Sequence, residues 1–308
     1  MIVSEGGCRL RRLHVVYNPK SQRGKFAGQM DKLIGTAQKH GFQVSFYRLG
    51  GVRRDAENML AGLDDQSVVI AAGGDGTLQM VASAFVKHDL DLPIGLLPYG
   101  TSNDFGDFLG LDTDINNLFS HLESGMIQPI DLGFAGDSCF VNVFSAGQLT
   151  RTSHEVERRY KNQLGMLAYY LHGVGNLPRI TPFRLRVRGQ LNLELNCLLF
   201  LATNGGSAGG FRNLAPRARL DDGLLEIIIV RECSWAEMAG VFWGVLRGEH
   251  QNNPSVVYTQ ASSLEIIGPD DIATDVDGEW GPALPTTLRV LPARLRLIGP
   301  TTGQVNLD

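Results

Sequence analysis

Apolar residues in the first 130 positions follow two spacings in turn. Short apolar or alternating runs bounded by turn residues predict strands, and they cover 13–17, 42–47, 67–72 and 93–97. Between these runs, apolar residues recur three or four positions apart, which is typical of helices with one buried face; Phe26, Met30, Leu33, Ile34 and Ala37 are an example. Repeated strand–helix units predict a doubly wound parallel sheet with helices on both faces.

The pattern changes near Asp131, after which strands dominate. Residues 183–188 alternate apolar and basic side chains, and further strand patterns cover 193–203, 224–230, 256–267 and 288–297. One helix is expected over 234–246, with Ser234 as its N-cap. A chain of 308 residues fits two domains. We therefore expect an α/β domain over 1–130 and a mainly antiparallel β-sandwich domain over 131–308, whose C-terminal segment is able to return to the first domain.

A glycine-rich loop follows the expected strand at 67–72. It reads Gly73-Gly74-Asp75-Gly76-Thr77, and a helical pattern begins directly behind it. Such a loop presents backbone N–H groups and a helix N-terminus to a phosphate, and Asp75 is able to hold Mg²⁺ or to shape the loop. The loop taken alone is more typical of an ordinary strand-to-helix turn.

A second Gly-Thr turn shifts the balance toward phosphate binding. Gly100-Thr101-Ser102-Asn103-Asp104 follows the expected strand at 93–97, and Asn18 follows the first strand. The carboxyl ends of parallel strands meet at one edge of a sheet, where ligands of such folds bind. We therefore expect 18–21, 73–77 and 100–104 to converge on one crevice, whereas Asn103 and Asp104 as simple helix caps are the alternative.

Composition excludes several classes of protein. The formal net charge is −4 and the pI is about 6.0, which disfavours nucleic-acid binding by bulk electrostatics. The four cysteines form no CxxC pair, so a zinc site is not expected, and Cys197 is expected in the core. Neither an apolar N-terminal segment nor a run of roughly 18 apolar residues is evident. We expect a cytoplasmic protein with at most peripheral membrane contact.

These motifs, taken in order, resemble the diacylglycerol kinase catalytic-domain family. Within that family the resemblance is to bacterial soluble lipid kinases, relatives of sphingosine and ceramide kinases. It extends over about residues 13–300. Its later parts are Asp131-Leu132-Gly133, Asn142, Gly147, Leu164-Gly165 through Tyr169, Thr203-Asn204-Gly205, Asp221-Asp222-Gly223-Leu224 and Asp277-Gly278-Glu279.

The resemblance implies roles for individual residues. It implies that the nucleotide and its Mg²⁺ are bound by Asn18, Gly73, Gly74, Asp75, Gly76, Thr77, Thr101, Asn103, Asp104 and Asp131. It implies Glu279 as general base, in a turn where clustered carboxylates would raise the proton affinity of one of them. It also implies a second, structural Mg²⁺ held by the Asp222 side chain and by the carbonyls of Arg219 and Leu224. The alternatives are a solvated acidic turn around Glu279 and a type I turn at Asp222.

We therefore expect an ATP-dependent kinase acting on a hydroxyl of a diacylglycerol-like lipid, with Mg²⁺ as cofactor and transient contact with a membrane surface. An NAD kinase shares a similar glycine loop and is one alternative. Gln79 and Met80 stand where the family usually has Asn-Glu, and Gln22 stands where it has glycine, so a catalytically weak nucleotide- or lipid-binding regulator is another.

Contacts with other surfaces are less clearly marked in the sequence. Arg9, Arg11 and Arg12 form one basic cluster, and Arg151, Arg158, Arg159 and Lys161 form another. Either could meet anionic headgroups, although a solvated charged face is the simpler interpretation. Trp235 and Trp243 are expected in the core of the β domain. The sequence does not indicate an oligomeric state.

Overall fold

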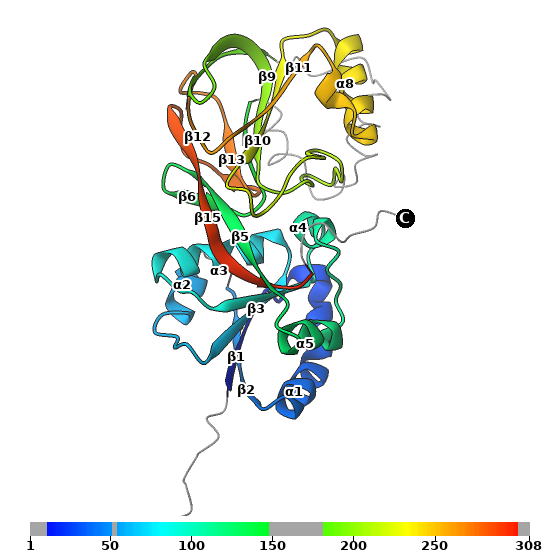
Figure 1. The fold of residues 1–308 in the computed structure, drawn as a ribbon, viewed down its shortest axis with the longest axis vertical. Coiled ribbons are helices and arrows are strands. Elements are labelled where there is room, and N and C mark those ends of the chain that lie inside the picture. Colours follow the sequence, from blue (N-terminus) through cyan, green and yellow to red (C-terminus); the bar gives the residue numbers. More distant parts are fainter. Residues whose placement is uncertain (1–10, 51–53, 148–180, 301–308) are drawn as a thin grey trace, which may run out of the picture. The chain divides into compact units, whose positions relative to one another are not determined.

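The computed structural model describes residues 11–50, 54–147 and 181–300. The chain divides into two compact units. The first comprises residues 1–101, 111–128 and 296–301, and the second comprises 102–110, 129–295 and 302–308. Helices and strands of both units are labelled in Figure 1.

The first unit is built on a parallel sheet. Its strands are β1 (Arg11–Tyr17), β2 (Phe42–Arg48), β3 (Ser67–Gly73) and β4 (Pro93–Pro98), together with the end of β15 (Thr286–Ile298). Their order is β2-β1-β3-β4-β15, and every pair is parallel. The parallel α/β half of the expected fold is confirmed.

Helices cover both faces of this sheet (Figure 1). α2 (Arg54–Met59) packs on α3 (Asp75–Lys87), while α1 (Met30–Lys39), preceded by the 3₁₀ helix η1 (Ser21–Gln29), packs on α5 (Ile115–Glu123). Strand β3 is buried along its whole length because it is covered on both faces. The core on the α1/α5 side includes Leu13, Leu33, Ile70, Leu118 and Phe119.

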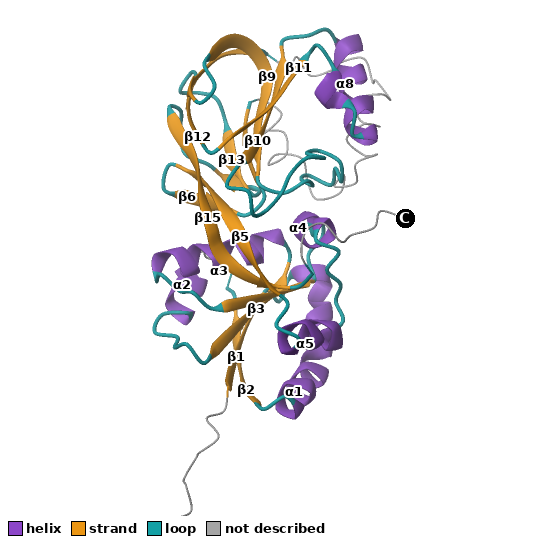
Figure 2. Cartoon of the chain, viewed as in Figure 1, coloured by secondary structure: helices purple, strands orange, loops and turns teal. Residues whose placement is uncertain are grey.

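Strands make up most of the second unit (Figure 2), and they pair antiparallel. They are β5 (Ile127–Ala135), β6 (Ser138–Phe140), β7 (Val143–Ala146), β8 (Phe183–Gly189), β9 (Leu193–Thr203), β10 (Leu225–Arg231), β11 (Val256–Ala261), β12 (Ser263–Ile267), β13 (Thr274–Val276), β14 (Glu279–Trp280) and most of β15. Its helices are α4 (Asp104–Phe108), α8 (Trp235–Arg247) and the short η3 (His250–Asn252). The expected antiparallel half is confirmed as well.

Strand β10 is buried on both of its faces. Ile227 and Ile229 join the main core of the unit, whereas Ile228 and Val230 join a second core under α8. The successive side chains of a strand point to opposite faces, so a continuous apolar run is what such a position requires. The run expected at 256–267 is two strands rather than one: β11 pairs with β10, and β12 pairs with β8 and β15.

The expectation that Trp235 and Trp243 lie in the core is wrong. Their relative exposures are 41% and 53%. The buried face of α8 is instead made by aliphatic and Met side chains, and the two indoles stand at exposed positions of the helix. Cys197 is buried as expected, and burial raises the pKa of its thiol to about 12.

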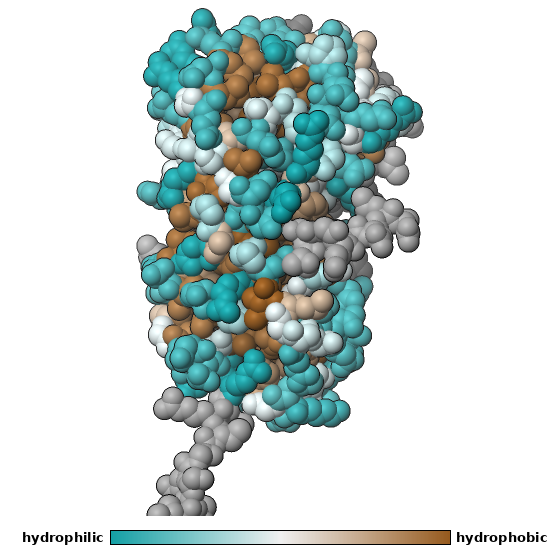
Figure 3. All heavy atoms as spheres, viewed as in Figure 1, coloured by the Kyte–Doolittle hydropathy of each residue, from teal (hydrophilic) through white to brown (hydrophobic). Residues whose placement is uncertain are grey.

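Of the basic residues expected to meet a membrane, only Arg11 and Arg12 lie within the described part of the chain. Most of the face seen in Figure 3 is hydrophilic. Arg11 lies over the ring of Phe42 at 4.4 Å, and Arg12 pairs with Asp64 at 3.0 Å. Arg9 and the basic cluster at 151–161 lie outside the described residues, as does the motif at 164–169. No helix in the described part of the chain is long and apolar enough to cross a membrane.

Candidate functional site

Three loops of the first unit leave its sheet at the same edge. β1, β3 and β4 are neighbouring parallel strands, and they end at Tyr17, Gly73 and Pro98. The backbone N–H of Asn18 donates to the carbonyl of Ala72 at 3.3 Å, which ties the loop after β1 to the end of β3. The sheet therefore brings together the loops that begin at Asn18, at Gly74 and at Tyr99. Residues 102–104 of the third loop belong to the second unit.

The side chain of Asn18 shapes its own loop. Its Oδ1 accepts a hydrogen bond from the Lys20 N–H at 2.9 Å, and its carbonyl accepts from the Ser21 N–H at 3.1 Å. Asparagine closes such turns because its short side chain mimics a backbone carbonyl. This turn leads directly into η1.

The glycines of the β3–α3 loop differ in what requires them. A methyl group added at Gly73 would lie 2.2 Å from Oγ1 of Thr77, so the buried Thr77 side chain needs glycine there. Gly74 is the N-cap of α3, and its carbonyl accepts from the Thr77 N–H at 2.8 Å. Gly76 is exposed, and a methyl group there would meet nothing within 4 Å. Gly76 therefore faces open space in front of the helix N-terminus, where an anion is favoured.

Two of the positions that depart from the expected family pattern lie on α3 behind this loop, and Gln22 lies in η1. Gln79 is buried, whereas Met80 is partly exposed. Asp75 stands in the first turn of α3 and is partly exposed.

The third loop enters α4 through a left-handed residue. Thr101 is exposed, and Asn103 has φ +56° and makes no side-chain cap. Asp104, which is buried, accepts from the Gly210 N–H with both carboxylate oxygens, at 3.0 and 3.2 Å. Asp104 therefore fixes the glycine-rich segment that follows β9.

Asp131 is buried and holds the Asp222 turn in place by hydrogen bonds. Its two carboxylate oxygens accept from the Gly223 N–H at 2.6 Å and from the Ala293 N–H at 2.7 Å, and its own N–H donates to Leu220 at 2.7 Å. A buried carboxylate needs such donors because it has lost its water. The residue that the resemblance assigns to the nucleotide thus also holds the turn assigned to a metal.

The Asp222 turn offers a cation one carboxylate and backbone carbonyls, but no cluster of ligating side chains among the described residues. Asp222 is at the surface, and its Oδ1 accepts from the Leu224 N–H at 3.0 Å. Partial burial raises the pKa of its carboxyl, and repulsion from Asp131 and Asp221 adds to this. A cation would relieve that repulsion. The described residues contain no group of three or more His, Cys, Asp or Glu able to hold a metal together, so a metal here would depend on carbonyl and water ligands, as the Arg219 and Leu224 carbonyls would supply.

The Asp-Gly-Glu turn separates its three carboxylates. Asp277, at φ +51°, accepts from three successive N–H groups, of Val141, Asn142 and Val143, at 2.7, 3.0 and 2.8 Å. Asp275 accepts from the Gly278 N–H at 2.9 Å. Glu279 is exposed on β14, and its carboxylate makes no hydrogen bond or ion pair with the described residues. Asp275 and Asp277 therefore stabilise the turn through backbone hydrogen bonds, and Glu279 is left exposed to solvent.

Asn204 links these two turns and was given no role by the sequence. Its Nδ2 donates to the carbonyls of Asp131 at 2.8 Å and Val141 at 3.1 Å, and its N–H donates to Asn142 at 2.8 Å. The signal in the sequence is an asparagine at the end of a buried strand, directly before two glycines. Asp277, Asn204 and Asp131 thus form one chain of contacts through the backbone at 141–143.

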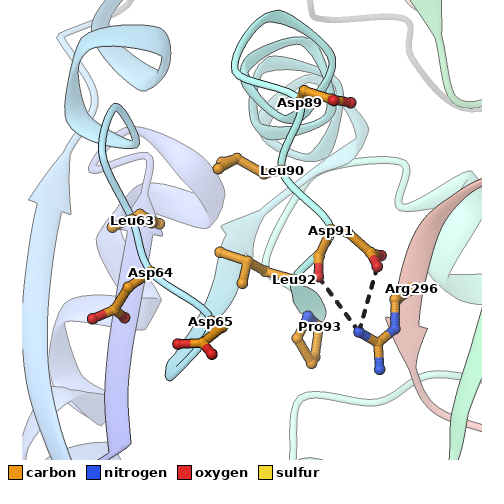
Figure 4. A pocket seen from close by; sticks show the side chains of 9 residues that line it. All are labelled: Leu63, Asp64, Asp65, Asp89, Leu90, Asp91, Leu92, Pro93 and Arg296. Carbon is orange, nitrogen blue, oxygen red and sulfur yellow. Dashed lines mark hydrogen bonds and ion pairs between the residues drawn. The ribbon is translucent and has the colours of Figure 1, made fainter.

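A hollow of about 530 Å³ lies at the opposite edge of the first unit's sheet. It is lined by loops that precede β3 and β4, with Asp64, Asp65, Asp89 and Asp91, and Arg296 lies 3.9 Å from Asp91 (Figure 4). It stands at the amino ends of the strands and is separate from the glycine loop.

Comparisons with known proteins identify the family of the chain. Residues 12–135 match the family model "Diacylglycerol kinase catalytic domain", and residues 142–299 match "YegS C-terminal NAD kinase beta sandwich-like domain". The chain is 33% identical to a diacylglycerol kinase of Staphylococcus carnosus over 295 residues, covering 94% of this chain and 95% of that one. It is 32% identical to a diacylglycerol kinase of Bacillus subtilis over 305 residues, covering 97% and 100%.

Solved structures share the fold. A diacylglycerol kinase from Bacillus anthracis superposes with a TM-score of 0.70 at 19% identity, covering 94% of this chain and 97% of that one. An NAD kinase from Archaeoglobus fulgidus, solved with ATP, gives 0.54 at 12% identity, covering 95% and 94%. The matches to both family models and to the bacterial relatives over nearly the whole length establish that the chain belongs to the diacylglycerol kinase family of phosphotransferases with an alcohol group as acceptor.

Proposed function

We propose that this protein transfers the γ-phosphoryl group of ATP to a hydroxyl of diacylglycerol or a closely related lipid. The observation that supports it best is the Asp-Gly-Glu turn, in which Asp277 spends its carboxylate on three backbone N–H groups and leaves Glu279 exposed. The choice of diacylglycerol as the proposed substrate rests on the names of the bacterial relatives.

In this proposal the first unit binds the triphosphate. The backbone N–H groups of 73–77 receive its phosphates, and Thr101 and Asn18 complete the edge of the sheet. Exposed Gly76 gives phosphate oxygens close access to the backbone, since no Cβ intervenes.

The acidic residues then serve the metal-bound nucleotide through water. Asp104 and Asp131 are buried and already accept backbone hydrogen bonds, so in this proposal any water of the bound nucleotide would share their carboxylates with the backbone. Asp75 and Asn103 complete this set in the proposal. Mg²⁺ would neutralise charge on the phosphates.

Glu279 is the proposed general base. The lipid hydroxyl oxygen attacks the γ-phosphorus, its proton passes to the Glu279 carboxylate, and the bond to the ADP oxygen breaks. Because Glu279 is exposed, it can meet a hydroxyl that arrives from outside the protein.

The decisive test is incubation with labelled ATP, a panel of lipids and NAD. Label that enters the organic phase with diacylglycerol supports the proposal. Label in NADP would show an NAD kinase, and nucleotide binding without any transfer would show a regulator, which is the reading that Gln79 and Met80 favour. The panel also includes phosphatidylglycerol and sphingoid bases, because the residues do not choose among lipid hydroxyls.

The proposed second Mg²⁺ at Asp222 is tested separately by thermal unfolding. Asp222→Ala should lower Tm in Mg²⁺ and abolish the rise of Tm that Mg²⁺ produces, while ATP affinity changes little. The variant removes one carboxylate ligand and leaves the glycine loop untouched. Asp221→Ala is the matched control, since Asp221 pairs with the Arg219 side chain at 3.1 Å. If both variants respond to Mg²⁺ like the wild type, the Asp222 site is withdrawn.

A further inference from the structure

Helix α8 turns its aliphatic side to the protein and its indoles outward. Met238, Val241 and Val245, spaced three and four residues apart, pack against the second core of the β unit. Trp243 is 53% exposed on the other side of the helix. Burying an indole is normally among the larger gains that a helix can make, so this orientation needs a reason outside the core.

The exposed side of α8 is nearly uncharged. Ala236, Gly240 and Trp243 follow one another along it, and Arg247 stands one turn beyond Trp243. The only acid on the helix, Glu237, is held by Ser234 in a capping box, with Ser234 N–H and Oγ both 2.7 Å from its Oε2. Arg247 makes no ion pair with the described residues. The surface thus combines one large aromatic ring with one uncommitted cation.

A polar hollow of about 450 Å³ opens beside Trp243. Gly240 and Gly244 lie in its wall, and η3 packs so closely on α8 that a methyl group on Gly244 would lie 2.9 Å from Cα of His250. Arg247, Asn252 and Asn253 line it together with the exposed acid Glu249. The guanidinium and the two amides are donors for phosphate oxygens next to the indole.

We propose that this face of α8 is the surface by which the protein lies on a phospholipid bilayer, with Trp243 at the level of the headgroups and Arg247 on a lipid phosphate. Indoles concentrate at this depth of a bilayer because one end of the ring is apolar and the other donates a hydrogen bond. A helix in the plane of the interface needs an apolar face and cations that reach the phosphates. The inference rests on the proposed function in one respect: diacylglycerol is dissolved in the bilayer.

The test is co-sedimentation with vesicles of phosphatidylcholine and phosphatidylglycerol in the absence of ATP. Trp243→Ala should lower the vesicle partition coefficient roughly tenfold, and Arg247→Gln roughly fivefold. Met126→Ala and Arg188→Gln are matched controls, since Met126 is an exposed apolar residue of the first unit and Arg188 is an exposed arginine of β8. Both controls should bind like the wild type.

Two further measurements distinguish a loss of membrane binding from a loss of folding and from a loss of catalysis. Thermal unfolding reports whether each variant is folded, and Trp243→Phe should retain more vesicle binding than Trp243→Ala. Activity is then measured on a water-soluble short-chain diacylglycerol and on the same lipid class in vesicles. Trp243→Ala should keep the first activity and lose most of the second.

Three results would overturn the surface assignment. They are vesicle binding by folded Trp243→Ala equal to that of the wild type, absence of vesicle binding by the wild type, and a self-association in solution that Trp243→Ala abolishes. The last would mean that a second copy of the chain covers α8. A wild type that binds vesicles through Trp243 but phosphorylates no lipid would instead refute the proposed function and leave the surface standing.

Discussion

Single carboxylates in this protein divide into those that shape backbone and those that are presented to solvent. Asp277 accepts three N–H groups and Asp131 accepts two, and both are surrounded by residues far away in the sequence. Glu279, two residues from Asp277, is exposed. Residue type alone does not separate these roles, because all of them are acids in short motifs.

Glu279→Gln should reduce turnover roughly 10²–10⁴-fold and leave ATP affinity nearly unchanged. Glutamine keeps the size and the hydrogen-bonding reach of the side chain but cannot accept a proton at neutral pH. Turnover is measured on the lipid identified by the panel, and ATP affinity by calorimetry. Asp270→Asn, an exposed acid elsewhere in the β unit, is the control. Near-wild-type turnover in Glu279→Gln would place the base elsewhere.

At the scale of elements, the β3–α3 junction combines two kinds of glycine. Gly73 is required by packing, since Thr77 fills the place of its side chain, whereas Gly76 faces open space. A sequence motif cannot separate glycines kept for the fold from glycines kept for a ligand. The space around each one can.

Gly73→Ala should therefore lower the stability of the protein, whereas Gly76→Ala should lower its affinity for ATP. Gly73→Ala should destabilise the protein by about 1–3 kcal/mol, because the methyl group overlaps Thr77. Gly76→Ala should be neutral or stabilising by up to about 1 kcal/mol, because alanine favours the helix. The same methyl should weaken ATP binding roughly 10- to 100-fold if backbone N–H groups there meet phosphate. Chemical denaturation and calorimetry measure the two effects, and unchanged affinity in Gly76→Ala would reduce the loop to an ordinary turn.

At the scale of the whole molecule, each unit has one buried histidine among the described residues, and burial disfavours the charged form of its ring. Burial is the main cause that lowers the pKa of His14 in β1, and it also lowers the pKa of His250 below α8. The unfolded chain takes up a proton at about pH 6.5, and the folded protein does so only at lower pH. Each histidine therefore contributes stability that is present above about pH 6.5 and is lost as the pH falls through the folded-state value.

Tm should accordingly fall by several degrees between pH 7 and pH 5. In His250→Gln this fall should be smaller, even where the absolute Tm is lower at both values, because one of the two protonation steps is gone. Differential scanning calorimetry at constant ionic strength measures both differences. An equal fall in the wild type and in His250→Gln would show that His250 does not contribute to the acid sensitivity.

Much of the fold could be predicted because it is encoded locally. The buried run before Gly73, the glycine turn, and the helix at Trp235–Arg247 with its Ser234 cap are each set by neighbours within a few positions. The short strands β6, β13 and β14 escaped prediction because they have two or three residues and depend on distant partners for their pairing.

The class of each half, the glycine loop and the family could all be predicted from the sequence, since turn chemistry and hydrophobic period act over short distances. Which acids accept hydrogen bonds from backbone N–H groups depends instead on the folded chain, because Asp131 and Asp277 bind residues 92 to 162 positions away. The folded chain also decided that Trp243 faces outward. The helical period of α8 offers two faces that are both apolar, and contact with β10 and β11 selected the aliphatic one.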